Sequence, residues 1–197
     1  MPQAHAIAWW IEIEALARDW PRVRQLEDRL RQPIHANIAT QQVSVIRALL
    51  LCAAARAHLA DATRATVLEH LANDLAHGPD DRLAAPHIRL ALAQDDLEGV
   101  ATLMAVTPHE WRPWATWWAL DLEVTRLDAL TALHDAAGVE AEAPKMLGSG
   151  DFINAIAKRA LGAVRRDPKL LHEATDAFTR MTLPRHVEQT ITLADLL

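Results

Sequence analysis

The chain has 197 residues, of which 51% are hydrophobic and 23% are charged, and its formal net charge is −6. Its arginines are interspersed with Asp and Glu, so it lacks the basic stripe that nucleic-acid binders carry, and we expect no nucleic-acid partner. Because it shows no signal-peptide pattern and no run of about 18 apolar residues, we expect a cytoplasmic protein that does not contact a membrane.

Helix-forming residues dominate, strand signals are nearly absent, and Pro, Gly and Asp divide the chain at short intervals. The sequence therefore predicts an all-α protein. The expected helices cover residues 3–18, 20–31, 36–59, 62–77, 81–94, 97–106, 113–133, 136–144, 151–165, 168–181 and 185–196. Helix breaks are expected at Pro33 and at Pro144, where a longer loop runs to Gly150.

One short pattern recurs at five of these breaks: an Asp that can cap a helix, followed four residues later by an apolar residue. The aspartates are Asp19, Asp61, Asp96, Asp135 and Asp167. Their spacings of 42, 35, 39 and 32 residues indicate repeated helix–turn–helix units. Chance is the alternative explanation, because Asp is a common capping residue in any helical protein.

The two helices of each unit differ in pattern. First helices are apolar on most faces, as in residues 6–17, 44–55 and 114–124, whereas second helices carry one apolar stripe. This alternation predicts a right-handed α-solenoid of about five tetratricopeptide-like (TPR-like) repeats plus a closing helix. We expect residues 1–197 to form one such domain; a compact helical bundle is the alternative.

The first helix lacks the polar outer face that the terminal repeat of a solenoid needs. It carries Trp9 and Trp10 within an apolar run. We therefore expect its outer face to be covered, either by an upstream repeat or by a second copy of the chain, which would make a homodimer.

Seven tryptophans and no tyrosine are present, and four of the tryptophans lie in the stretch WRPWATWW. Their spacing places three of them on one helix face. They either fill gaps between stacked helices or form an aromatic surface for a protein or peptide partner, since Trp and Arg are favoured at interfaces. In the second interpretation the binding residues are Trp111, Arg112, Trp114, Trp117, Trp118 and Glu123.

Residue patterns that would support catalysis or metal binding are weak. The segment HEATD at 172–176 lacks the second His of a zinc-protease motif, and His70 with Asp74 suits a solvated helix face. Ser149 lies in GSG without a preceding strand. Cys52 stands in an apolar run and is interpreted as a buried hydrophobe in a reducing compartment. We expect no enzymatic activity, metal or cofactor.

The carboxy-terminal half contains four further short sequence motifs: LDAL at 127–130, EAEAP at 140–144, RALG at 159–162 and FTRM at 178–181. Because of these motifs, roughly residues 110–197 resemble the TPR-like helical region at the C-terminus of large bacterial signalling ATPases. These are the LuxR-type regulators and their adenylate or guanylate cyclase relatives. One departure is Thr182, which replaces the family's Gly and makes a left-handed helix end less favoured. The resemblance implies either an excised helical array or a short stand-alone relative.

The resemblance also implies a region that receives a partner or inducer and regulates neighbouring domains. We therefore predict a non-enzymatic interaction module of a bacterial signalling or transcription-regulatory system, which binds a protein or peptide partner on its helical surface. The alternative is an inducer sensor with a Trp-lined pocket between the helices. An open groove would favour the peptide, and a closed cavity would favour the small molecule.

Overall fold

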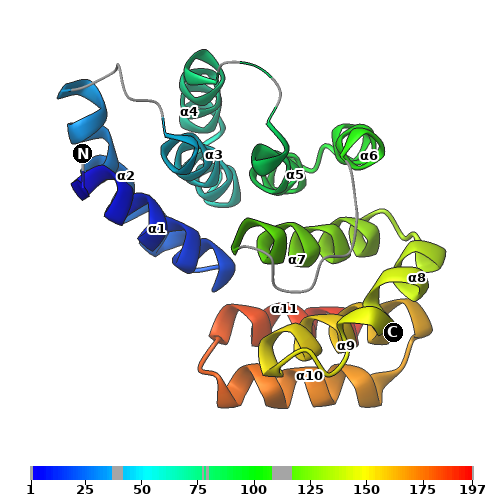
Figure 1. The fold of residues 1–197 in the computed structure, drawn as a ribbon. Helices are drawn as coiled ribbons and strands as arrows, with labels where there is room; N and C mark the ends of the chain where they lie inside the picture. Colours follow the sequence, from blue (N-terminus) through cyan, green and yellow to red (C-terminus); the bar gives the residue numbers. More distant parts are fainter. Residues whose placement is uncertain (1, 37–41, 77, 79, 108–116, 197) are drawn as a thin grey trace. The chain divides into compact units, whose positions relative to one another are not determined.

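The computed structural model describes residues 2–36, 42–76, 78, 80–107 and 117–196, which form α-helices and a 3-10 turn without any β-strand (Figure 1). The all-α prediction is thus confirmed. The elements are α1 Pro2–Leu16, α2 Trp20–Ala36, α3 Val43–His58, α4 Ala62–Leu75, η1 Asp81–Leu83, α5 Ala84–Ala93, α6 Leu97–Val106, α7 Trp117–Ala132, α8 Ala136–Met146, α9 Asp151–Arg165, α10 Pro168–Arg180 and α11 Pro184–Asp195.

The chain divides into two compact units, Met1–Asp121 and Leu122–Leu197. In the first unit, α3 packs against α1, α2, α4 and α5, and α5 packs against α6. In the second unit, α9 packs against α8, α10 and α11. A single continuous solenoid with a right-handed path stays a prediction.

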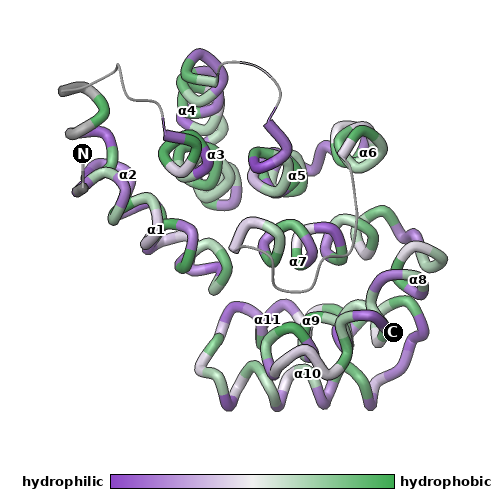
Figure 2. Tube along the Cα trace, in the orientation of Figure 1, coloured by the Kyte–Doolittle hydropathy of each residue, from purple (hydrophilic) through white to green (hydrophobic). Residues whose placement is uncertain are grey.

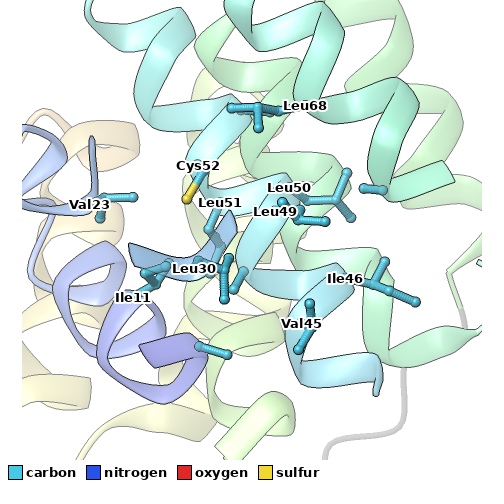
Figure 3. Close-up of a cluster of buried hydrophobic side chains, with 14 of the residues drawn as sticks. Ile11, Val23, Leu30, Val45, Ile46, Leu49, Leu50, Leu51, Cys52 and Leu68 are labelled. Atoms are coloured by element: carbon cyan, nitrogen blue, oxygen red, sulfur yellow. The ribbon is translucent and has the colours of Figure 1, made fainter. Parts of the chain in front are cut away.

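Helix α3 forms the centre of the first unit. Every residue from Ser44 to Ala55 is buried, as expected of a helix that is apolar on most faces and enclosed by its neighbours. Figure 3 shows side chains of α3 among Ile11 of α1, Leu30 of α2 and Leu68 of α4. The second helices differ: along α10, for example, hydrophobic and hydrophilic segments alternate (Figure 2), and one stripe is buried.

The same turn ends the first helix of five successive helix pairs. One residue in each turn has a left-handed backbone with φ between 52° and 60°: Arg18, Ala60, Asp95, His134 and Arg166. The next residue is the recurring Asp, and its N–H donates to the carbonyl five residues earlier at 2.8–3.0 Å. This is the long hydrogen bond of a Schellman motif, which satisfies a carbonyl at the helix end.

The recurring Asp also begins the second helix. Its carboxylate accepts a backbone N–H from the first turn of that helix at 2.9–3.3 Å. The apolar residue four positions later is buried in all five cases, namely Val23, Ala65, Val100, Val139 and Leu171. The pattern seen in the sequence therefore corresponds to one structural motif, which reverses the chain, caps the second helix and anchors that helix in the core.

Three local expectations were wrong. Helix α2 continues through Pro33 to Ala36, and α8 continues through Pro144 to Met146. In both cases the extra turn brings an apolar side chain into the core, since Ile34 and Met146 are buried. Thr182 adopts the left-handed conformation with φ 59°, because Leu183 N–H then bonds the carbonyl of Phe178 at 3.0 Å.

The recurring turn predicts opposite effects for two Ala→Gly substitutions in the first unit. Ala60 is exposed and left-handed, so Ala60→Gly should stabilise the unit by about 0.5–1 kcal/mol, because the strain removed exceeds the added chain entropy of the unfolded state. Ala101 is exposed inside α6, so Ala101→Gly should destabilise it by about 1 kcal/mol. Urea denaturation followed by circular dichroism measures both; equal destabilisation would contradict this account of the turn.

Candidate functional site

The predicted tryptophan site is only partly described. Trp111, Arg112 and Trp114 lie outside the described residues. Trp117 and Trp118 begin α7 and are half-buried. Glu123 is 7% exposed, which differs from the exposed rim position expected for it.

The two described tryptophans of this segment pack inside the first unit. The ring centroid of Trp117 lies 6.4 Å from that of Trp9 in α1, with the rings tilted by 38°. The guanidinium of Arg47 lies 6.0 Å from the ring centroid of Trp118. The structure thus places Trp117 beside a helix that was not in the predicted binding set.

Helix α1 has two apolar faces. Its inner face, which includes Ile7, Ile11 and Ala15, is buried in the core of the first unit. Its outer face carries Ala6, Trp9, Trp10 and Ile13, whose spacing places them on one side of the helix. Trp9 and Trp10 are each 37% exposed and Ile13 is 52% exposed. We call these four residues the α1 outer stripe.

Hydrogen bonds fix both indoles of the stripe in place. Trp9 Nε1 donates to His5 Nε2 at 2.8 Å, and the other ring nitrogen of His5 lies 3.0 Å from Ser44 Oγ. Trp10 Nε1 donates to Glu14 Oε1 at 2.8 Å. With their polar atoms satisfied within the chain, the indoles present apolar surface in a set orientation, which lowers the entropy lost when they bind.

Two arginines of α2 border the stripe. The guanidinium carbons of Arg22 and Arg29 lie 5.0 and 5.5 Å from the ring centroid of Trp10, within the range of cation–π interactions. Helix α2 therefore gives the apolar stripe a positively charged edge.

A buried charge network lies behind α1, centred on Arg47 of α3, whose side chain is fully buried. Arg47 Nε donates to Glu12 Oε1 at 2.9 Å, and Nη2 donates to Asp121 Oδ2 at 2.7 Å. Its Nη1 donates to the carbonyl of Arg82. Arg89 donates to the other oxygen of Asp121 at 2.8 and 3.1 Å. The network ties α1, α3, η1, α5 and the start of α7 together.

Burial dominates the electrostatics of Glu12. It raises the pKa of the Glu12 carboxyl above its ordinary value, although the adjacent Arg47 guanidinium acts in the opposite direction. Sequence reasoning missed this network, because Glu12, Arg47 and Asp121 each stand within an apolar helix. A lone charge in an otherwise apolar helix was the available signal, and it did not identify the partner.

Two hollows are lined by described residues, and no Trp lines either of them. One, of about 300 Å³, lies in the second unit beside His134, Arg166 and Leu193. The other, of about 400 Å³, lies in the first unit beside Leu83, His87 and other side chains. Burial lowers the pKa of His87, which favours a neutral ring there. Neither hollow supplies the Trp-lined pocket of the sensor interpretation.

The described residues offer little support for metal binding or for thiol chemistry. They contain no group of three or more His, Cys, Asp or Glu side chains that could hold a metal ion. Cys52 is fully buried, and burial raises the pKa of its thiol. No described helix has the length and apolar character needed to cross a membrane.

Comparison of the chain with protein-family models, curated proteins and solved structures gives no match. The geometry of the chain itself must therefore support any functional proposal. The strongest candidate site is the α1 outer stripe with its α2 edge and Trp117.

Removing the Asp121 charge should strongly destabilise the first unit. Asp121→Asn leaves the buried guanidinia of Arg47 and Arg89 without their shared anion, and breaking a buried pair in this way costs about 3–5 kcal/mol. Arg82→Ala, which removes the largely exposed pair with Asp80, should cost about 1 kcal/mol or less. Chemical denaturation measures both variants, and similar small losses would show that the network contributes little.

The Cys52 thiol should be inert in the folded protein. Its burial and raised pKa keep it protonated and inaccessible, and thiolates are the reactive form. A colorimetric thiol reagent should therefore react at the rate of unfolding in native buffer and rapidly in denaturant. Fast reaction under native conditions would contradict the burial of Cys52.

Proposed function

We propose that the chain is a non-enzymatic interaction module that binds a protein or peptide partner through the α1 outer stripe, with Trp117 at its edge. The observation that carries this proposal is the exposure of Trp9, Trp10 and Ile13 on a helix whose opposite face already completes the core. A contiguous exposed apolar patch with tryptophan and arginine is typical of interaction sites.

The proposal moves the binding surface from the 111–118 segment to α1. Trp117 belongs to both surfaces, because its ring lies beside Trp9. A role in bacterial signalling or transcription regulation is part of the proposal and rests on the sequence resemblance alone. A second copy of the chain is the other protein that could cover the stripe, and it would make the chain a homodimer.

Substitution of one exposed residue tests the proposed surface. Ile13→Asp places a charge at the C-terminal end of the stripe, on its most exposed large side chain, where it would be buried by a partner, so affinity should fall by about 30-fold or more. Val67 of α4 is 50% exposed and lies outside the stripe, so Val67→Asp is the matched control. The measurement is affinity capture from an extract of the source organism, together with light scattering of the purified chain.

We expect the wild-type chain and Val67→Asp to retain the same partner and Ile13→Asp to lose it, while all three show the same helical content. If the wild type is a dimer and Ile13→Asp is a monomer, the partner is a second copy. Retention of every bound protein by Ile13→Asp would exclude the α1 outer stripe as the binding surface.

A further inference from the structure

Helix α2 concentrates positive charge in an acidic chain. It carries Arg22, Arg24, Arg29 and Arg31 against two acidic residues, Glu27 and Asp28. Glu27 is buried and bound to Arg56 and Arg64 of the neighbouring helices, and Asp28 is exposed, so the arginines outnumber the exposed acid four to one. Within the described residues none of these four α2 arginines forms an ion pair, whereas Arg47, Arg56, Arg64, Arg82 and Arg89 of the same unit all do. The arginines at the basic edge of the stripe can therefore form ion pairs with carboxylates of a partner.

Arg22 and Arg29 are the two that face the stripe. Both guanidinia lie over the ring of Trp10, and the side-chain hydrogen bond of Arg22 goes to the neutral amide of Gln25 at 2.9 Å. Guanidinium groups bind carboxylates through paired, charge-assisted hydrogen bonds, and stacking on an indole orients them beforehand. Glu14 lies on the same edge, where it accepts the indole N–H of Trp10 and leaves the two arginines in excess.

From this arrangement we infer that the partner segment is an acidic amphipathic helix. Its apolar face packs on the α1 outer stripe, and its carboxylates reach Arg22 and Arg29. This inference rests on the proposed function and specifies the chemistry of the partner.

The shape of the stripe favours a helix as the occupant. Residues 6, 9, 10 and 13 cover two turns of α1, about 10 Å along the axis, and form a ridge of the kind that packs against another helix. Helix-in-groove recognition uses matching apolar residues at i, i+3, i+4 and i+7. Among the described residues the positive edge lies on the α2 side of the stripe, which sets the acidic flank of the partner toward α2.

An anionic membrane is the competing occupant, since Trp and Arg also suit lipid interfaces. The charge distribution favours the helix. A flat anionic surface would meet Glu14 and the net charge of −6 over the whole chain, whereas a single helix meets chiefly Arg22 and Arg29.

Three designed peptides of about 18 residues test the inference, a length at which isolated helices begin to form. They share one leucine stripe and differ in the flanking residues, which are Glu, Gln or Lys. We expect the full chain to bind the Glu peptide about tenfold or more tightly than the Gln peptide, by calorimetry at low salt. The preference should shrink in high salt, and the Lys peptide should bind most weakly.

Variants of the α2 arginines show which residues produce the preference for the Glu peptide. The double variant Arg22→Gln, Arg29→Gln should lose the preference, so that it binds the Glu and Gln peptides with equal affinity. Arg24→Gln is the matched control, because residues two apart on a helix do not share a face, and it should keep the preference.

The outcomes of these experiments distinguish the proposed binding surface from the proposed acidic partner. Equal binding of all three peptides, abolished by Ile13→Asp, would overturn the acidic partner and leave the α1 outer stripe as the binding surface. Peptide binding that Ile13→Asp does not change would overturn the surface itself. Binding to vesicles of anionic phospholipid without binding to any peptide would overturn the helical partner in favour of a membrane.

Discussion

A guanidinium removed from water must keep partners for its charge and its N–H groups, and each unit of this protein is built around one such group. In the first unit Arg47 bonds Glu12, Asp121 and a backbone carbonyl. In the second, Arg159 bonds Asp128 at 2.7 Å and two side chains of α11. Because these bonds join side chains of different helices, the buried arginines constrain how the helix faces align within each unit.

The recurring turns were readable from the sequence because they are local. Asp61 caps α4, bonds back to the end of α3 and is followed by the buried Ala65, all within a few residues. The arginine networks are not local: Arg47 is 35 residues from Glu12 and 74 from Asp121. Helical periodicity places each charge on a face of its own helix, but only tertiary packing decides which faces meet. Pro33 and Pro144 were misjudged for a related reason, since burial of the following turn outweighs the local cost of proline.

The candidate site could be predicted only in part. The density of tryptophan directed attention to residues 111–118, but Trp117 turned out to be half-buried against Trp9. The all-round apolar pattern of α1 indicated that its outer face needs a cover, and in the single chain that face is exposed. The arginines of α2 stand close together in the sequence, but their place beside the stripe had no signal there, because Arg22 and Arg29 become neighbours of Trp10 only when α2 folds back along α1.

The recurring turn and the proposed binding surface are therefore connected. The left-handed Arg18 and the cap Asp19 reverse the chain between α1 and α2, which brings two arginines over an indole on the preceding helix. In the free chain these guanidinia cover part of Trp10 and limit the apolar surface exposed to water. In a complex the same groups would bond carboxylates while the stripe packs against apolar side chains. One short turn thus sets the spacing between the apolar and the charged half of the proposed site, so recognition there would depend on the element that also builds the fold.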